Sequence, residues 1–334
     1  PTCHLDPRPG SARRVPVRAV VYAEYGAPDV LRVEDVPVPT PGPAQVLVRV
    51  AATSLNLTDW EGLRGSPAYA RIGGLRSPAR PILGSDIAGV VDAVGGDVDR
   101  FRPGDEVYGD NLGLKGGFAE FAIAPETALA PKPDGLTFAE ASTIPQAGAI
   151  ALQGTAAAGP GVRLLINGGG GGTGMFAIQL AKRAGAHVTA VDNEGKLEFM
   201  RSLGADEVID YRVDDFTRGQ PTYDIILDLV AHRSVRRLRR SLNPGGRYLY
   251  VGGPLHRLLR VITVGAIGAR LTGRRMGLLA VKQGPDHFGP LAELCRSGDV
   301  AVRIDRSFTL DEVPEAIAAV GDGSICGKAV VDVA

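Results

Sequence analysis

Short apolar runs separated by turn residues fill the first 125 positions of the chain. Apolar and polar residues alternate in part over residues 45–52, which is the pattern of a strand with one buried face. Pro103-Gly104-Asp105 is a turn signal between two such runs. The runs occupy residues 17–25, 31–37, 45–52, 87–94, 106–109 and 118–123. Short strands at these intervals predict an all-β, barrel-like first domain.

Beyond Pro125 the pattern changes to helices that alternate with buried strands. Helical patterns occupy residues 138–142, 147–158 and 233–242, and apolar strands occupy residues 164–166, 187–191, 207–209, 225–229 and 248–251. This alternation predicts a parallel, doubly wound sheet. The last part of the chain has a helix at 288–296, a strand around 302–304, a helix at 310–320 and a strand at 329–333. We expect this part to rejoin the first domain.

These patterns predict an α/β protein in which one domain is inserted into another. The 334 residues suit two domains better than one. We expect a tail at residues 1–15, a barrel domain formed by residues 16–128 and 283–334, and a doubly wound domain formed by residues 129–282.

A glycine-rich stretch, residues 168–174, joins the strand at 164–166 to a helical pattern. Gly169, Gly171 and Gly174 fit G-x-G-x-x-G. In that motif the first glycine allows a sharp turn, the second lets the backbone approach a pyrophosphate, and the third lets the helix pack closely on the strand. The next strand ends at Asp192, about 20 residues past the glycines, where a dinucleotide fold places an acid. A flexible glycine loop is the alternative, but the β-α-β context favours dinucleotide binding at a helix N-terminus.

The composition is that of an ordinary globular protein and argues against several classes of partner. Hydrophobic residues make up 44% and charged residues 22%, and Lys+Arg and Asp+Glu both total 37. A net charge of zero gives no reason to expect nucleic acid or an acidic membrane as a partner. The three cysteines are scattered, and we expect neither a signal peptide nor a membrane-spanning segment. These features favour a cytoplasmic protein.

Several blocks of sequence together resemble the medium-chain dehydrogenase/reductase superfamily, and within it the zinc-independent, quinone-oxidoreductase-like branch. The blocks lie at residues 54–59, 83–91, 102–109, 116–120, 164–178, 203–211 and 327–331. The resemblance covers nearly the whole chain. It implies a GroES-like β-barrel joined to a Rossmann domain, with cofactor and substrate in the cleft between them.

The residue types at the expected zinc positions predict a protein without a metal. Catalytic zinc needs cysteine, histidine or carboxylate ligands that converge on one ion. Where zinc-dependent relatives place a cysteine ligand, the chain resembles them but has Asn56, and where they place a His-Glu pair it has Ser85-Asp86. The lobe that would hold a structural zinc has no cysteine, and the five histidines are isolated from one another.

The predicted lack of zinc narrows the chemistry that the chain can support. Without a Lewis acid, reducing a quinone or an activated C=C bond is easier than oxidising an alcohol. The resemblance implies the same activity, NAD(P)H-dependent reduction of quinones or α,β-unsaturated carbonyls. Asn56 and Asp59 match the family's N-x-x-D motif beside the nicotinamide, with a helix N-cap and a polar turn as the alternative. Tyr69, on the loop expected to border the cleft, could donate a proton to the product enolate or serve only as an aromatic lid.

We expect the cofactor to be NAD(P)H, and the choice between its two forms rests on opposing arguments. Asp192 can accept hydrogen bonds from a ribose 2′-OH and would repel a 2′-phosphate, so it favours NADH. Family habit favours NADPH, and Lys196 is a nearby cation that could bind the phosphate. The residues expected to bind the cofactor are Asn56, Gly169, Gly171, Gly172, Thr173, Gly174, Asp192, Lys196, Tyr211, Val230, Gly252 and Lys328.

Two departures from the family keep other functions open. Ile150 stands where many relatives have a threonine that binds the nicotinamide carboxamide, and residues 255–282 mix apolar with basic side chains. The alternatives are an enoyl reductase of a biosynthetic pathway and a non-catalytic nucleotide-binding or interaction protein. By analogy with the family we expect a homodimer, with the apolar residues 261–267 near its interface, and no firm association with membranes.

Overall fold

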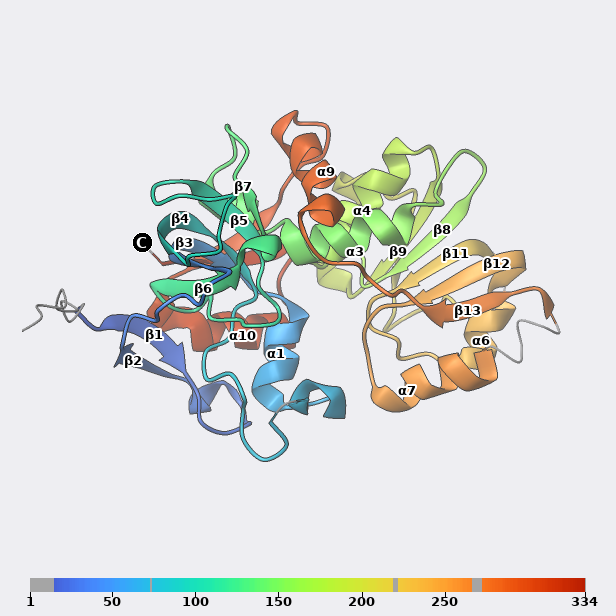
Figure 1. The fold of residues 1–334 in the computed structure, drawn as a ribbon. Coiled ribbons are helices and arrows are strands. Elements are labelled where there is room, and N and C mark those ends of the chain that lie inside the picture. Colours follow the sequence, from blue (N-terminus) through green and yellow to red (C-terminus); the bar gives the residue numbers. More distant parts are fainter. Residues whose placement is uncertain (1–14, 73, 219–221, 266–271, 334) are drawn as a thin grey trace, which may run out of the picture.

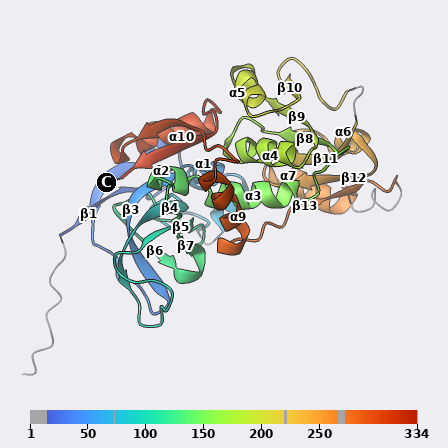
Figure 2. The ribbon, with the colours of Figure 1, turned by 90° about the horizontal axis from the view of Figure 1, so that it is seen from above.

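The structure is a computed structural model that describes residues 15–72, 74–218, 222–265 and 272–333. Two large sheets lie side by side, with α3 (Pro145–Thr155) and α9 (Pro285–Arg296) between them (Figure 1, Figure 2). Residues 1–14 of the expected tail and residues 266–267 of the apolar stretch lie outside the described residues. The α/β class predicted from the sequence is confirmed.

The six-stranded sheet is parallel throughout and has a doubly wound order. Its strands are β8 (Arg163–Asn167), β9 (His187–Asp192), β10 (Glu207–Asp210), β11 (Tyr223–Asp228), β12 (Leu242–Tyr250) and β13 (Arg275–Leu278). The spatial order is β10-β9-β8-β11-β12-β13, so the direction of winding reverses between β8 and β11. At that reversal the last residues of the two strands, Asn167 and Asp228, pair with each other. Because ligands bind at the carboxyl ends of strands where the order reverses, the topology places a nucleotide site here.

Helices pack on this sheet through apolar side chains. Met175 and Phe176 of α4 (Gly172–Arg183) are buried in the core, and α3 packs beside α4. In the basic helix α6 (Val235–Arg240), Val235 and Leu238 face the core, so most of its arginines form a solvated face. This domain also contains α5 (Leu197–Ser202) and α7 (Leu255–Arg260).

The second sheet is the GroES-like barrel, and the C-terminal strand belongs to it. Its strands are β3 (Gln45–Ser54), β4 (Asp86–Val94), β5 (Glu106–Asp110), β6 (Phe121–Pro125), β7 (Leu129–Pro131), β14 (Ile304–Phe308) and β15 (Lys328–Asp332). β15 pairs with β3, where Val331 lies opposite Thr53. Around the barrel lie the hairpin of β1 (Val17–Val21) and β2 (Arg32–Val36), and the helices α1 (Leu57–Arg64), α2 (Phe138–Ser142) and α10 (Val313–Gly321). The limits of the domains along the chain stay a prediction.

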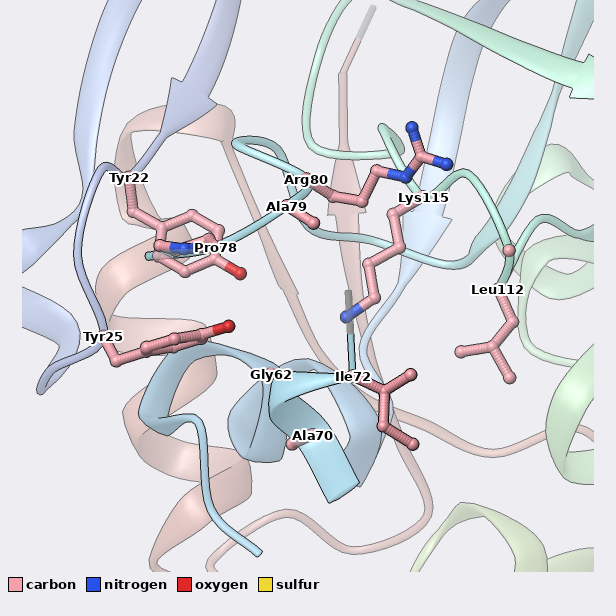
Figure 3. Close-up of a pocket in the computed structure, with 11 residues that line it drawn as sticks. Tyr22, Tyr25, Gly62, Ala70, Ile72, Pro78, Ala79, Arg80, Leu112 and Lys115 are labelled. Atoms are coloured by element: carbon pink, nitrogen blue, oxygen red, sulfur yellow. The ribbon is translucent and has the colours of Figure 1, made fainter. Parts of the chain in front are cut away.

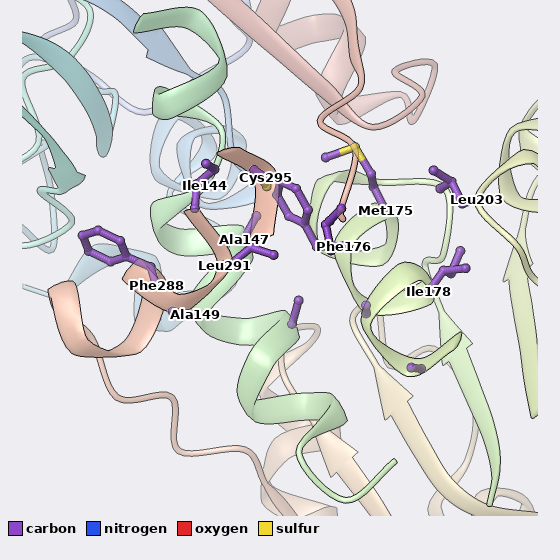
Figure 4. Packing of buried hydrophobic residues seen from close by; sticks show 14 of the residues in the cluster. Ile144, Ala147, Ala149, Met175, Phe176, Ile178, Leu203, Phe288, Leu291 and Cys295 are labelled. Carbon is purple, nitrogen blue, oxygen red and sulfur yellow. The ribbon is translucent and has the colours of Figure 1, made fainter. Parts of the chain in front are cut away.

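One hydrophobic cluster joins the two sheets. Ala147 of α3, Phe176 of α4 and Leu291 of α9 are buried together in it (Figure 4). The ring of Tyr108 on β5 meets the ring of Phe288 on α9 edge to face, with centroids 5.1 Å apart. The barrel and the parallel sheet are therefore held together by a shared core, and not only by the chain segments that connect them.

Several elements differ from their predicted limits, and local reasons explain three of these differences. The helix expected at 288–296 begins at Pro285, since proline is favourable in the first turn of a helix. The helix expected to reach residue 242 ends at Arg240, because Leu242 already pairs with Tyr223 in the sheet. The strand expected around 302–304 instead covers Ile304–Phe308, where it pairs with β15.

We expect Phe288→Ala to lower the free energy of unfolding by about 3–5 kcal/mol, since it leaves a cavity where two domains share their core. Phe288 is 0% exposed. Urea denaturation followed by circular dichroism measures the change. The matched control is Val213→Ala, whose side chain is 81% exposed and whose loss should cost less than about 0.5 kcal/mol. Equal stability of both variants would show that α9 does not hold the domains together.

Candidate active site

The glycine-rich loop lies between β8 and α4, and each motif glycine has a different steric environment. A Cβ on Gly169 would lie 2.9 Å from the Cβ of Ala190, and a Cβ on Gly174 would lie 2.4 Å from the Gly169 carbonyl oxygen. A Cβ on Gly171, the N-cap of α4, would meet nothing nearer than 3.8 Å. The loop therefore presents bare backbone at the N-terminus of α4, a cradle that fits the pyrophosphate of a dinucleotide.

Asp192 and Lys196 fold over this loop. The Asp192 carboxylate accepts hydrogen bonds from the backbone N–H groups of Gly170 and Asn193, both at 2.9 Å. Lys196 is only 6% exposed, and its Nζ lies 3.9 Å from Oδ1 of Asp192. The structure thus brings together the acid and the cation expected near the ribose, and the cation offsets part of the charge of the acid.

The other residues expected to bind the cofactor lie around the carboxyl ends of neighbouring strands. Val230 follows β11, and Gly252 follows β12. Tyr211 follows β10, and its backbone N–H donates to the Asp192 carbonyl oxygen at 3.1 Å. Thr173 lies in the first turn of α4, next to Gly172. All of them share the edge of the sheet on which the glycine loop lies.

Lys328 connects this edge to the barrel. The residue before it, Gly327, donates its N–H to the Gly170 carbonyl oxygen at 2.9 Å. The Lys328 ammonium donates to Oδ1 of Asn56 at 2.8 Å and lies 3.6 Å from Oδ2 of Asp86. The side chain is 2% exposed, and this burial lowers the pKa of Lys328. A buried cation therefore stands at the junction of the two domains.

The side-chain amide of Asn56 is held on both sides. Its Nδ2 donates to Oδ2 of Asp86 at 2.9 Å and to Oγ of Ser85 at 3.3 Å, while its Oδ1 accepts from Lys328. The structure thus brings together the residues at the positions where zinc-dependent relatives have their ligands, which are Asn56, Ser85 and Asp86. Among the described residues, no three His, Cys, Asp or Glu side chains form a group that could hold a metal ion.

Asp59 closes the start of α1 and is fully buried. Its carboxylate accepts hydrogen bonds from the backbone N–H of Asn56 at 2.9 Å and of Gly84 at 3.0 Å. The first of these contacts is half of a capping box. Asp59 therefore fixes the backbone of Asn56 and has no exposed carboxylate surface with which to touch a ligand.

Buried carboxylates surround the Lys328 ammonium and differ in protonation. Burial raises the pKa of Asp86 to about 6, with Lys328 opposing that shift. Burial, reinforced by the nearby Asp86 charge, raises the pKa of Asp110 to about 8. At pH 7 the geometry therefore favours an ionised Asp86 beside Lys328 and a protonated Asp110 behind it.

Tyr69 lies on a single 3-10 turn, Ala68–Arg71, on the barrel side of the boundary between the domains. Its hydroxyl is 3.2 Å from Oε1 of Glu61 and 3.3 Å from the Gly253 carbonyl oxygen. Gly253 follows β12, so this contact crosses between the domains. Burial and the charge of Glu61 raise the pKa of Tyr69, which keeps the phenol protonated at neutral pH.

Sequence reasoning does not identify Glu61 or Asp110. Glu61 is an acid on a short helix, and such an acid is usually solvated. The Glu61 side chain is partly buried beside Tyr69, which also contacts Gly253, a residue far along the chain. The available sequence signal is the short distance along the chain: Glu61 precedes Tyr69 by eight residues, and Gly65 ends the helix between them.

Comparisons with known proteins agree with this geometry. Residues 42–134 match the family described as alcohol dehydrogenase GroES-like domain, and residues 203–331 match the family described as zinc-binding dehydrogenase. The chloroplastic quinone-oxidoreductase QR1 of Triphysaria versicolor is 33% identical over 95% of this chain and 98% of its own length. The 2-methylene-furan-3-one reductase of Solanum lycopersicum is 33% identical over 94% of this chain and 79% of its own length. The structure of the quinone oxidoreductase from Coxiella burnetii superimposes with a TM-score of 0.84 at 30% identity, over 95% of this chain and 99% of that one.

None of the helices in the described ranges has the length and apolar character needed to cross a membrane.

We expect Gly171→Ala to weaken nucleotide binding at least about tenfold, which is about 1.4 kcal/mol, while the protein stays folded. The added methyl group has room in the protein but would stand between the loop and a pyrophosphate. The contrasting variant is Gly174→Ala, whose methyl group would collide with the Gly169 carbonyl oxygen and lower thermal stability. Isothermal titration with NADH and NADPH, together with thermal melts, separates the two effects. Unchanged affinity in Gly171→Ala would remove this loop from the nucleotide site.

Proposed function

Since the chain belongs to the medium-chain dehydrogenase/reductase superfamily, in its quinone-oxidoreductase-like branch, we propose that it reduces a quinone or an α,β-unsaturated carbonyl without zinc. The chain is an NAD(P)H oxidoreductase of this superfamily. The proposal that the reaction needs no zinc rests on the side-chain contacts of Asn56. Lys328 binds its amide on one side, and Asp86 with Ser85 binds it on the other; we call this arrangement the clamp.

The clamp supports zinc independence through its charge. A buried ammonium 3.6 Å from Asp86 already supplies the positive charge that a metal ion would bring to this point. Like charges a few ångströms apart repel strongly in a buried environment, so a divalent cation would have to displace Lys328. Asn56 and Ser85 are also neutral oxygen and nitrogen groups, which are poor replacements for thiolate and imidazole ligands of zinc.

The residues of the chain divide the work of the proposed reaction. A bound reduced nicotinamide supplies a hydride. The bare backbone at Gly171 and the helix N-terminus behind it would hold the pyrophosphate, and Val230 and Gly252, which follow two neighbouring strands, would bind other parts of the cofactor. Asn56, held rigid by its clamp, orients the reacting end of the cofactor and excludes water there. Tyr69 holds a proton at the boundary between the domains and can donate it to the oxygen or carbon that gains charge.

A second candidate is an enoyl reductase of a biosynthetic pathway, which would use the same groups on a thioester. The relative from Solanum lycopersicum is named as a furanone reductase, which favours an activated C=C bond as one target class. The third reading, a non-catalytic nucleotide-binding protein, rests on Ile150, which replaces a hydrogen-bonding threonine in the resemblance. Turnover of any quinone, enone or enoyl thioester would exclude it.

We also propose a cytoplasmic homodimer that takes a small-molecule substrate, with neither nucleic acid nor a membrane as a partner. The dimer rests on analogy with the family, and light scattering at micromolar concentration tests it. Exposed apolar side chains on the helical segment after β12, Leu259 and Ile262, support an interface there.

We expect the purified protein to oxidise NADH or NADPH with simple quinones or enones, and Asn56→Ala to lower turnover more than about tenfold. The amide acts at the reacting end of the cofactor, so nucleotide affinity should change less than turnover. Stopped-flow absorbance of the reduced nicotinamide measures turnover, and titration measures affinity. Metal analysis after exhaustive dialysis is the companion measurement. One zinc per chain that is required for activity would overturn the proposal.

We expect the wild type to prefer NADH, and Asp192→Ser to shift the ratio of dissociation constants towards NADPH by about tenfold. The substitution removes a carboxylate that repels a 2′-phosphate and frees Lys196 to bind it. Titration of both cofactors into both proteins gives the ratio. Glu198→Ser, which removes an equal charge from an exposed site on α5, should leave the ratio unchanged. Tighter binding of NADPH by the wild type would show that Asp192 does not read the ribose.

A further inference from the structure

Glu61 and Tyr69 form a hydrogen-bonded pair at the boundary between the two domains. The Tyr69 hydroxyl is 3.2 and 3.3 Å from the two carboxylate oxygens of Glu61, and 3.3 Å from the Gly253 carbonyl oxygen. A phenol has one proton, so it donates to one of these acceptors at a time. When Glu61 is protonated it becomes a donor to Tyr69, and the phenolic proton is then free to point elsewhere.

The surroundings of Glu61 favour this protonated form near neutral pH. Burial raises the pKa of Glu61 to about 7, against the opposing effects of the Tyr69 hydrogen bond and the Lys115 charge. Tyr250 of β12 also lies close enough to Glu61 for their charges to interact. Burial and the Glu61 charge raise the pKa of Tyr250 to about 12, so the Tyr250 hydroxyl stays neutral. Within the described ranges, Glu61 has no ion pair at 4 Å or less. The carboxyl group therefore changes its protonation in the range in which an enzyme works.

A cavity of about 470 Å³ lies beside α1 (Figure 3). Gly62, the neighbour of Glu61, forms part of its wall, and the Lys115 side chain extends across it towards Gly62. The Lys115 ammonium lies 2.7 Å from the point that a Cβ on Gly62 would occupy. The hydroxyls of Tyr22 and Tyr25 point into the same space. A polar cavity of this size holds water, and its wall at Gly62 and Lys115 adjoins Glu61, so this water is the nearby source of protons in the inference that follows.

We propose that Glu61 is a proton-relay residue that reloads Tyr69 during the reduction of an activated C=C bond. This inference rests on the proposed function. It adds a positioning role for a residue outside the family motif, and it favours α,β-unsaturated carbonyls over quinones as the substrates that need the pair.

In the reduction of an enone, the relay supplies one proton for each hydride that the cofactor transfers. Hydride adds to the β-carbon, and the C=C bond becomes an enolate with its charge shared between oxygen and the α-carbon. Tyr69 gives its proton to the α-carbon, which completes the saturated ketone and leaves a phenolate. Glu61 passes its own proton to that phenolate, and water in the cavity returns a proton to Glu61. One hydride and one proton are consumed for each ketone formed.

A quinone depends less on this relay. Hydride addition to a quinone gives a hydroquinone anion, an oxygen base that exchanges protons with water without help. An enolate must be protonated at carbon, which is slow unless an acid is held against it. The two substrate classes therefore test the relay separately from hydride transfer.

The first measurement is the titration of Glu61 itself, without cofactor. Carbon-13 NMR of glutamate-labelled protein, assigned by comparison with Glu61→Gln, should give a pKa near 7. Tyr69→Phe removes a donor that stabilises the carboxylate, so it should raise that pKa further. A Glu61 that titrates near the ordinary value of a glutamate would overturn the proposal.

The second measurement is the pH dependence of turnover. In the wild type, kcat for an enone should fall about tenfold per pH unit above pH 7, because protonated Glu61 must reload Tyr69 before each new turnover. Glu61→Gln should lower the enone rate at pH 6 at least about tenfold and abolish this limb, with quinone rates within about twofold of the wild type. Glu61→Asp keeps a carboxyl group and should restore part of the limb. Glu293→Gln, on α9, removes an equal charge at an exposed site and should change neither rate.

The outcomes separate this inference from the function on which it rests. If Glu61→Gln reduces enones with the same fall in turnover above pH 7 as the wild type, the relay is overturned and the proposed function is unaffected. Equal slowing of quinone and enone reduction also overturns the relay, because it indicates a structural role for Glu61. A wild type that oxidises no nicotinamide with any substrate overturns the proposed function, and the relay with it.

Discussion

The buried contact of Lys328 with Asn56 and Asp86 is the interaction on which the rest of the site depends. Lys328 begins the last strand of the barrel, and the residue before it hydrogen-bonds to the glycine loop of the inserted domain. A single dipeptide thus fixes the nucleotide cradle relative to Asn56. Burying an ammonium is costly unless its partners are in place, so β15, β4 and the start of α1 must pack together before this charge is compensated.

The same constraint organises the acids around it. Asp86 compensates Lys328 directly, Asp59 accepts hydrogen bonds from two backbone N–H groups, and burial raises the pKa of Asp110 to about 8. Asp110 therefore holds a proton at neutral pH, and Asp86 is left to compensate Lys328. The site is therefore stabilised by matching each charge with a partner or a proton, and not by excess positive charge.

The fold and the cofactor cradle could be predicted from the sequence because their signals are local. Gly169, Gly171 and Gly174 follow one another along the chain, and the structure gives each the steric environment that the motif requires. The alternation of strands and helices likewise reports the doubly wound order directly. The offset of β14 could not be predicted, since its register is set by pairing with β15 more than twenty residues later. Glu61 could not be predicted for the same reason, because this partly buried acid meets Tyr69 only in the folded chain, where Tyr69 also contacts Gly253.

The two domains supply different parts of the proposed reaction, and this division explains why the contact at Gly253 matters. The parallel sheet carries most of the groups proposed to hold the cofactor, whereas Tyr69 and Glu61 lie on the barrel. A proton donor on one domain can meet a hydride acceptor held on the other only if the domains have a fixed separation. The shared core of α3, α4 and α9 sets that separation at one end of the boundary, and Lys328 sets it beside the glycine loop. Tyr69 then needs no large movement, since its hydroxyl already contacts the cofactor domain and requires only that Glu61 release it.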